Sequence, residues 1–437
     1  MIKVKDITME KTVKKVGVAL LGLGTVGTGT YQILTSLRAK IREQYSVDIE
    51  VRHVLERSAE RVKALGISEK IVAKDIETVI SDTQTSIVCE FFGGIEPAKS
   101  FLIASLRAGK SIVTANKEMF AKNWAELDAA AKEGNAGLYF EATCAGGVPI
   151  IRALQESMQG NNIKSVMGIV NGTTNFILSK MSDEGKEYAS VLKEAQDLGY
   201  AEANPSADVD AFDSMYKLSI LSTIAFRKKV PITKIYREGI TQIDKVDIEM
   251  GKKFGFALKL LAIGKFEHGK IEARVHPAFI PLSHPLASVK GSFNAVHVLG
   301  DNVGDLMFYG RGAGALPTGS AIVSDIVFCA TSTTHNHYKL TDADTKVADC
   351  DFSTDFECEY YLRMSVADKT GVLAKLASTF ANNGVSIASL QQIDKDGVAE
   401  IVFMLHKTRE SKLNKAIAEI KAIPDVKSIG GVIRIER

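Results

Sequence analysis

Four acidic side chains and a lysine gather in one stretch of the chain, residues 199–220, where they could bind and deprotonate a small polar molecule. The acids are Glu202, Asp208, Asp210 and Asp213. Asp213 and Lys217 are four residues apart, so on a helix they share one face. Leu221 and Ile220 nearby would dock that face against a core. An ordinary ion pair on a solvated helix surface is the simpler interpretation of the same spacing.

A scaffold for this chemistry begins in the first 150 residues. An apolar run over residues 15–21 is typical of a buried strand, and a helical pattern follows the glycine motif GLGTVG at residues 22–27. Between a strand and a helix, such glycines allow a tight turn, close approach of a pyrophosphate and close helix packing. The residues predicted to border a dinucleotide are Gly22, Gly24, Thr25, Val26 and Gly27. A purely structural turn is the alternative.

The end of the second predicted strand, residues 49–55, bears on the choice of coenzyme. It is followed by Glu56 and Arg57. An acid at this place binds the ribose hydroxyl of NAD, whereas an arginine accommodates the 2′-phosphate of NADP. Both are present, and Arg57 tilts the prediction slightly toward NADP; a surface pair without a cofactor role stays open.

Alternation of strands and helices continues, with strands predicted over residues 86–92, 111–113 and 138–142. This order predicts a doubly wound parallel sheet, whose ligands lie at the carboxyl ends of the strands. The residues at such ends are Gly93, Gly94, Asn116, Lys117 and Gly146. Lys117 would begin a helix, where a cation is unfavourable, so a functional role is favoured over a merely structural lysine.

A second domain is predicted over residues 151–315. A strand at 163–170 leads into the polar turn NGTTN at 171–175, which could cap the next helix or offer hydroxyl and N–H groups to a substrate carboxylate. Spacing does not separate these two roles. Strands over 258–266 and 270–279 indicate an open sheet that also pairs subunits.

The remaining segments follow from glycine, polar and apolar patterns. Residues 309–314 predict a glycine-rich turn, and small residues at 317–320 open a helix over 321–329. We expect residues 316–330 to return to the nucleotide domain, with a hairpin turn as the alternative. Residues 331–355 form a predicted linker. Residues 356–437 give a βαββαβ pattern, an antiparallel sheet that could pair with another copy.

Composition limits the class of protein. The chain has 437 residues, 46% hydrophobic and 24% charged, with a net charge of +2. These values are typical of a soluble globular protein and argue against nucleic acid or an anionic membrane as a partner. No apolar run is long enough to cross a bilayer, and the N-terminus lacks a cleavage-type segment. The five cysteines form no CxxC pair, so we expect a cytoplasmic protein.

Eight motifs in a fixed order resemble the homoserine dehydrogenase family over nearly the whole of the first two domains. They are GLGTVG (22–27), GG-x-EPA (93–98), TANK (114–117), EATCAGGVPII (141–151), NGTTNFIL (171–178), LGYAEANPSADVDAFDSMYKLSIL (198–221), HPLA (284–287) and GRGAGALPTGSAIVSDI (310–326). The tail resembles an ACT domain through DKTGVL at 368–373. The resemblance implies an α/β protein with a Rossmann-type sheet, an α+β substrate and dimerisation domain, and an ACT-like regulatory domain.

The implied activity is the NAD(P)-dependent interconversion of L-homoserine and L-aspartate 4-semialdehyde, in threonine and methionine biosynthesis. The implied catalytic residues are Lys217, Lys117 and Asp213. The implied substrate-binding residues are Glu202, Asp208, Gly172 and Thr173. The implied cofactor-binding residues include Gly93, Lys117, Arg57 and Gly314. The resemblance also implies a homodimer or homotetramer.

A proton must leave the homoserine hydroxyl as the hydride leaves C4, and no histidine lies in these loops, so a lysine is the candidate base. Two neighbouring ammonium groups, here Lys117 and Lys217, disfavour each other's charge, while Asp213 opposes that effect. Glu202 would hold the substrate ammonium group. Which lysine takes the proton stays open.

Two further sites follow from the resemblance. The loop at 141–148 resembles the family's monovalent-cation loop, with Glu141 and backbone carbonyls at Cys144, Gly146 and Val148 as ligands of Na⁺ or K⁺. The ACT-like tail implies feedback by threonine, and a plain dimerisation module is the alternative. The implied effector-binding residues are Asp368, Gly371 and Asn383.

The chain departs from the family at two positions. Asn204 stands where aspartate is usual, which removes a charge near the substrate, and Ala211 stands where glycine is usual, which adds a methyl group. Two other classes of function stay open, a different amino-acid dehydrogenase such as one acting on aspartate, and a non-catalytic amino-acid sensor. The combination of Lys117, Glu202, Asp213 and Lys217 argues against a sensor, which has no need of all four.

Overall fold

The computed structural model describes residues 13–334, 346–395 and 398–437. The chain divides into two compact units. The first comprises the described parts of Met1–Ser157 and Ala313–Thr341, and the second those of Met158–Gly312 and Asp342–Arg437. Residues 335–345 of the expected linker lie outside the described ranges.

The first unit is built on a five-stranded sheet with the order β2-β1-β3-β4-β5. All of its pairings are parallel. The strands are β1 (Lys14–Leu21), β2 (Val47–Leu55), β3 (Thr85–Glu90), β4 (Ser111–Thr114) and β5 (Leu138–Tyr139). The strand order reverses between β1 and β3, and ligands of such sheets bind in the crevice outside the strand ends at that place.

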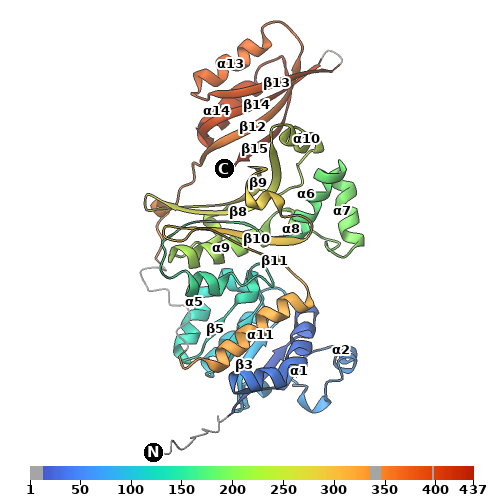
Figure 1. Cartoon of the computed structure of the whole chain (residues 1–437), viewed down its shortest axis with the longest axis vertical. Coiled ribbons are helices and arrows are strands. Elements are labelled where there is room, and N and C mark those ends of the chain that lie inside the picture. Colours follow the sequence, from blue (N-terminus) through green and yellow to red (C-terminus); the bar gives the residue numbers. More distant parts are fainter. Residues whose placement is uncertain (1–12, 335–345, 396–397) are drawn as a thin grey trace, which may run out of the picture. The chain divides into compact units, whose positions relative to one another are not determined.

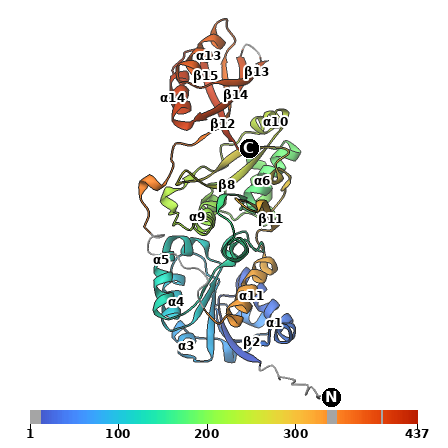
Figure 2. The same cartoon turned by 60° about the vertical axis from the view of Figure 1, so that its left-hand side comes forward.

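Helices cover both faces of this sheet. They are α1 (Thr25–Tyr45), α2 (Ala59–Ala64), α3 (Ile76–Ser81), α4 (Ala98–Arg107), α5 (Lys117–Glu133) and α11 (Ala315–Thr331). Figure 2 shows α3, α4 and α5 on one side and α1 and α11 on the other. Glycine lets α1 and α11 touch, because a Cβ atom at Gly29 would lie 2.0 Å from Ala315 O. The predicted doubly wound fold is confirmed.

The second unit contains a mixed sheet that runs β11-β10-β6-β8-β9 through its substrate domain. These strands are β6 (Ile163–Ile169), β8 (Phe256–Glu267), β9 (Lys270–Pro281), β10 (Phe293–Gly300) and β11 (Gly304–Arg311). The helices are α6 (Gly172–Glu184), α7 (Tyr188–Asp197), α8 (Ser206–Val209), α9 (Phe212–Phe226) and α10 (Lys245–Lys253). Helix α9 is apolar around most of its circumference and packs on β6, β8 and β9. No helix in the described ranges has the length and apolarity needed to span a membrane.

The C-terminal part of the second unit confirms the predicted βαββαβ order. Its elements are β12 (Glu357–Ala367), α13 (Val372–Asn382), β13 (Ile387–Lys395), β14 (Val398–Arg409), α14 (Glu410–Lys421) and β15 (Val426–Ile435). Strand β15 also pairs in parallel with β9, so this sheet continues that of the substrate domain (Figure 1). A two-residue strand, β7 (Tyr236–Arg237), pairs with β9 as well.

Two boundaries predicted from local pattern were wrong. The strand expected at 138–142 ends at Tyr139, and Glu141–Thr143 is a 3₁₀ turn whose first N–H donates to Asp325 instead of to a neighbouring strand. The turn expected at 309–314 starts later, since Tyr309 and Gly310 pair with β10 inside β11. Helix α11 begins at Ala315, before Pro317, because proline fits the first turn of a helix.

Candidate active site

In the glycine turn after β1, each glycine meets a different structural requirement. Gly22 has a φ of +98°, a backbone conformation that L side chains rarely adopt, and a Cβ at Gly27 would lie 2.2 Å from Gly22 O. A Cβ at Gly24 would meet nothing within 4 Å. Helix α1 starts there with no side-chain cap and no acid in its first turn. The turn therefore presents open backbone and uncapped N–H groups, as a pyrophosphate requires.

A cavity of about 760 Å³ lies beside this turn. It brings together four of the expected cofactor residues, Gly22, Gly24, Arg57 and Gly93. Thr25, Val26 and Gly27 form the first turn of α1, and Gly314 immediately precedes Ala315 at the contact with Gly29. The structure thus brings four of the expected cofactor residues to one cavity, while Lys117 and Gly314 lie outside its lining.

The carboxylate of Glu56, which lines this cavity, is hydrogen-bonded to backbone N–H groups. It accepts hydrogen bonds from the backbone N–H groups of Leu23 at 2.6 Å and of Arg57 and Ser58 at 2.9 Å. Burial works against ionisation, but these donors outweigh it and lower the pKa of Glu56. Arg57, Arg61 and Lys74 line the same cavity and supply positive charge.

Lys117 begins α5, and the residue before it ties two loops together. Asn116 Oδ1 caps the helix at Met119 N, while Asn116 Nδ2 donates to Phe92 O and to Gly94 O at 2.8 Å. Buried Glu90 accepts hydrogen bonds from Phe92 N and from the Thr114 hydroxyl, both at 2.6 Å. Burial raises the pKa of Glu90 to about 7. Glu90 is absent from the predicted site, although its place at the end of β3 is a signal that could have identified it.

The expected substrate residues of the second unit meet around Asn171. Lys217 Nζ donates to Asp213 Oδ2 and to Val170 O, each at 2.7 Å. Asn171 Nδ2 donates to Asp208 Oδ1 at 2.7 Å and to Asp213 Oδ2 at 2.9 Å. The surface-pair interpretation fails, because the side chains of Lys217 and Asp213 are only 10% and 8% exposed. We call Asn171, Asp208, Asp213 and Lys217 the substrate cluster.

Asn171 serves the first of the two roles that the sequence left open, that of a helix cap, and it also binds the two aspartates. Its Oδ1 accepts from Thr174 N and so caps α6, while its Nδ2 holds the two aspartates. Burial, and then the charge of Asp213, raises the pKa of Asp208. The polar turn is therefore a helix cap and part of the cluster at once.

Gly172 and Thr173, two of the other expected substrate residues, directly follow the asparagine of this cluster, and Glu202 makes no described contact with it. A Cβ at Gly172 would be 2.7 Å from Ser292 O, so this glycine allows a close backbone approach. Thr173 Oγ1 donates to Tyr200 O at 2.7 Å, which ties α6 to the loop that carries Glu202. Glu202 itself is exposed, and the contacts described within this unit do not join its carboxylate to the cluster.

The two departures from the family pattern lie on either side of α8. Asn204 is exposed and its Oδ1 accepts from Ser206 N, so it supports the start of α8. Ala211 precedes α9 with a φ of 63°. That left-handed conformation costs a residue with a Cβ about 1–2 kcal/mol, so the added methyl group has a conformational effect that its size alone does not reveal.

The loop of the expected cation site is held from its first residue. The Glu141 carboxylate accepts from Ile151 N and Arg152 N, each at 2.8 Å. The side chain of Glu141, itself an expected ligand, therefore fixes the start of the next turn, and the other three expected ligands are backbone carbonyls. Ala145 and Gly146 have φ values of 52° and 55°. Among the described residues, no group of three or more His, Cys, Asp or Glu could hold a metal ion.

The three expected effector residues do not come together within one chain. Asp368 is exposed before α13, and Gly371, with a φ of +90°, is its N-cap residue. Asn383 is at the opposite end of this 11-residue helix, roughly 16 Å away at 1.5 Å per residue. Asn383 Nδ2 donates to Glu419, while its buried Oδ1 has no hydrogen-bond partner among the described residues.

Comparison with known proteins identifies the family. Residues 22–141 match the NAD-binding domain of homoserine dehydrogenase, residues 149–327 match homoserine dehydrogenase, and residues 360–425 match the ACT domain. The homoserine dehydrogenase of Corynebacterium glutamicum is 43% identical, over 97% of this chain and 96% of its own. This chain belongs to the homoserine dehydrogenase family. It is an NAD(P)-dependent oxidoreductase, and the dehydrogenase function predicted from its motifs is confirmed.

Solved homoserine dehydrogenases have the same fold. The structure from Thiobacillus denitrificans has a TM-score of 0.91 and 38% identity and covers 97% of this chain and 98% of its own. A hyperthermophilic archaeal homoserine dehydrogenase in complex with NADPH has a TM-score of 0.62 and 30% identity, over 72% of this chain and 97% of its own. For this homoserine dehydrogenase, Lys117 and the substrate cluster belong to different units, so the convergence of Lys117 with Lys217 stays a prediction.

Proposed function

We propose that this enzyme interconverts L-homoserine and L-aspartate 4-semialdehyde and that the substrate cluster binds the amino alcohol. The observation that carries the proposal is the buried Lys217–Asp213 pair, which Asn171 joins to Asp208. The amide of Asn171 holds the two aspartates and Asp213 holds Lys217, so a small polar molecule meets fixed places for its ammonium and hydroxyl groups. When bound, the nicotinamide accepts the hydride from C4.

Lys217 is the proposed proton carrier. In homoserine oxidation the neutral amine form of Lys217 takes the hydroxyl proton and becomes an ammonium group, and in the reverse reaction that ammonium group returns a proton to the carbonyl oxygen. Asp213 and Val170 O accept hydrogen bonds from Nζ on two sides, so the lysine enters the reaction already oriented. Asp208 and the exposed Glu202 supply negative charge for the substrate ammonium. Lys117 is proposed to act beside the nicotinamide.

The test is homoserine oxidation by the purified full chain, followed as reduced-coenzyme absorbance with NAD and with NADP. Aspartate replaces homoserine in a parallel assay. Turnover with homoserine and none with aspartate supports the proposal. Turnover with aspartate alone would overturn it and favour the other dehydrogenase class.

We further propose that NADP is the preferred coenzyme. Arg57, Arg61 and Lys74 offer three cations for a 2′-phosphate, and Glu56 is already occupied by backbone donors. These three donors take most of the roughly four lone-pair sites of the carboxylate, which weakens it as an acceptor for the ribose hydroxyls of NAD. The NADPH in the archaeal relative is compatible with this choice. A lower KM for NAD than for NADP would contradict it.

A monovalent cation is proposed for the loop at 141–148, held by the carbonyl oxygens of Glu141, Cys144, Gly146 and Val148. Carbonyl oxygens suit Na⁺ or K⁺, and each has two lone pairs, so Glu141 O and Val148 O can accept their backbone N–H groups and still bind an ion. The ion would brace the loop beside Pro317 of α11, which contacts Gly147. Activity that rises when NaCl or KCl replaces choline chloride at equal ionic strength supports this site, and equal activity would exclude it.

Feedback by threonine through the ACT-like domain is proposed as well. The unpartnered Asn383 Oδ1 is an acceptor for an amino-acid ligand, and Asp368 and Gly371 lie at the far end of the same helix. A site that uses all three needs the helix ends of two chains. Titration of the full chain with threonine, with Asn383→Ala as the control, should release heat only with the unchanged protein. A plain dimerisation module would release none.

The outer strands of the second unit support assembly as a homodimer or homotetramer. Strands β11 and β13 end the strand order on either side, and β11 exposes Met307 and Tyr309. An open edge of this kind is completed by a strand from another copy. Light scattering of the purified chain gives the number of copies, and a monomer would exclude the assembly.

We propose a cytoplasmic location.

A further inference from the structure

Strand β7 and the C-terminal strand β15 lie end to end along one edge of β9. Strand β7 pairs with Arg274 and Val275, and β15 pairs with Ala278 and Phe279 further along. Strand β8 takes the opposite edge of β9 over its whole length. The ACT-like domain therefore reaches the substrate domain next to residues 236–240, which we call the bridge segment.

Arg434 of β15 holds the first part of the bridge segment. Its side chain is 7% exposed and donates from Nη1 to Glu238 Oε2 at 2.8 Å and from Nη2 to the Tyr236 hydroxyl at 3.0 Å. Its Nε donates to Glu410 of α14 at 3.0 Å, inside the ACT-like domain. The guanidinium lies 4.7 Å from the centre of the Tyr236 ring. One buried cation thus connects a helix of the ACT-like domain to the bridge segment.

Arg237, the next residue in the bridge segment, contacts residues that lie between Asp208 and Asp213 of the substrate cluster. Its Nη1 donates to Asp210 O, and its guanidinium lies 3.6 Å from the centre of the Phe212 ring. These two residues occupy the joint between α8 and α9, with Asp208 before it and Asp213 after it. Arg237 therefore fixes the backbone that sets the separation of the two cluster aspartates.

The end of the bridge segment also contacts the joint between α8 and α9, here through backbone atoms. Ile240 N donates to Val209 O at 2.8 Å, and Ile240 is fully buried. A Cβ at Gly239 would lie 2.4 Å from Val209 O and 2.8 Å from the Cα of Asp210. This distance leaves no space for a side chain, so a shift of the bridge segment must move the joint.

We propose that the bridge segment positions the substrate cluster, with Arg237 as a positioning residue, and that Arg434 makes this positioning depend on the ACT-like domain. The inference rests on the proposed function, because it assigns the substrate cluster to homoserine binding. The test of the proposal measures the energetic coupling between the two arginines.

The experiment uses the full chain, saturating coenzyme and initial rates of homoserine oxidation. Arg237→Ala and Arg434→Gln should each raise the KM for homoserine about tenfold, within the usual range of coupling between sites. The KM for coenzyme should stay unchanged, since neither arginine is in the coenzyme cavity. Arg237→Lys should recover part of the loss, because lysine can still donate to Asp210 O.

The double variant separates a shared route from two independent defects. If both arginines act through the bridge segment, Arg237→Ala combined with Arg434→Gln should raise the KM no further than the larger single change. Multiplication of the two effects would overturn the proposal.

The matched control is Arg363→Gln. Arg363 also joins the ACT-like domain to the substrate domain, through Asp247 of α10 at 2.6 Å, and its side chain is 12% exposed. Its described partners are outside the bridge segment. Arg363→Gln and Arg434→Gln should both lower the Tm, but only Arg434→Gln should raise the KM for homoserine. An equal rise of this KM in the two variants would indicate a general loosening of the interface and would contradict the proposal.

Glu238→Gln provides a milder change if Arg434→Gln does not fold, because the Glu238 side chain is 40% exposed. It should raise the KM for homoserine by a smaller factor. An unchanged KM in Glu238→Gln and in any folded Arg434 variant would end the inference while leaving the proposed function intact. Lack of homoserine turnover by the unchanged enzyme would remove the proposed function itself, and the inference with it.

Discussion

Lys217 Nζ lies 2.7 Å from Asp213 Oδ2, one turn earlier on α9, and both side chains are buried. An ion pair of this kind on a helix surface contributes little to the free energy of unfolding. When the pair is buried, removal of either partner destabilises the protein strongly. Apolar residues on nearly every side of α9 provide the burial. The helix thus holds its charged pair in a buried position, at a cost that its apolar packing offsets.

Replacement of Lys217 tests the proposed proton carrier. Lys217→Ala should lower kcat for homoserine oxidation at least about a hundredfold, the scale of general acid–base loss. The control is Lys193→Ala, which breaks the exposed i,i+4 pair with Asp197 on α7. That variant should keep the kcat of the unchanged enzyme. Near-normal turnover in Lys217→Ala would remove this lysine from the mechanism.

Asn171→Ser tests the amide that joins the two aspartates. Serine is also a good N-cap residue, so α6 should keep its stability within about 1 kcal/mol. Its short side chain cannot span to both Asp208 and Asp213, so the two carboxylates should lose their common donor. We expect kcat/KM for homoserine to fall about tenfold or more, with a loss of stability of about 1–3 kcal/mol from the unpaired carboxylates. Unchanged kcat/KM and Tm would indicate that Asn171 is only a helix cap.

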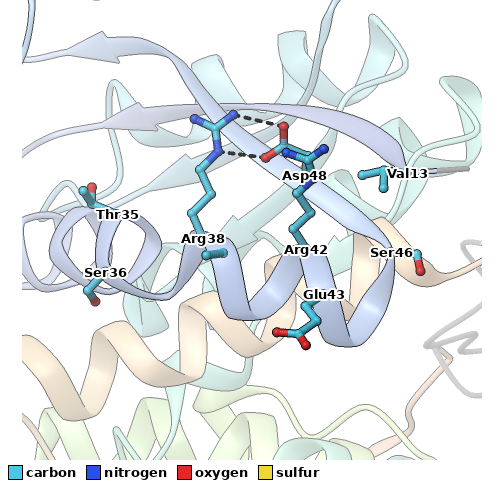
Figure 3. A pocket seen from close by; sticks show the side chains of 9 residues that line it. Val13, Thr35, Ser36, Arg38, Arg42, Glu43, Ser46 and Asp48 are labelled. Atoms are coloured by element: carbon cyan, nitrogen blue, oxygen red, sulfur yellow. Dashed lines mark hydrogen bonds and ion pairs between the residues drawn. The ribbon is translucent and has the colours of Figure 1, made fainter. Parts of the chain in front are cut away.

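Arg57→Ala tests the coenzyme proposal. Loss of a cation at the 2′-phosphate should raise the KM for NADP about tenfold and leave the KM for NAD unchanged. Arg38→Ala is the matched control in the same unit, since Arg38 lies in a separate hollow where it pairs with Asp48 at 2.7 Å (Figure 3). That control should affect neither KM. Equal rises for both coenzymes in Arg57→Ala would contradict 2′-phosphate recognition.

The pH dependence of stability tests the buried Glu90. Its pKa is about 7 in the folded protein, raised by burial from 4.5. Between these values the folded state keeps a proton that the unfolded state has lost, so the contribution of Glu90 to stability falls as pH rises through this window. Above pH 7 the full cost of the buried charge is present. The Tm of Glu90→Gln minus that of the unchanged protein should therefore increase as the pH rises from 5 to 8.

The control for this measurement is Glu133→Gln, at an exposed pair with Arg107. Its Tm should stay parallel to that of the unchanged protein across the same pH range. Parallel curves for Glu90→Gln as well would show that Glu90 does not titrate in this window.

The order of strands and helices could be predicted because it depends on residues near one another in the chain. The apolar run before Gly22 and the alternating pattern of the tail correspond to β1 and to β12–β15. Errors came where distant residues override local pattern. Gly310 looks like a turn residue, but pairing with Asn294 keeps it inside β11.

The candidate site could be predicted only as a set of residues. The i,i+4 spacing of Asp213 and Lys217 was enough to suggest a shared face, and motif order was enough to identify the family. Asn171 was recognised as a cap, but its reach to Asp208 and Asp213 depends on the packing of α6 against α8. Glu90 was missed although it lies at the end of β3, because its hydrogen bonds to Thr114 and Asn116 join residues far apart in the chain.

By itself the sequence determined the glycine turn, the residue types of the cluster and the family, since these depend on backbone geometry and spacing over a few residues. Only the tertiary structure decided that Lys217 and Asp213 are buried, that the Glu141 side chain binds backbone N–H groups, and that Arg434 meets Tyr236 and Glu238. Those relationships join residues far apart in the chain, and only the packing of strands and helices brings them within hydrogen-bond distance.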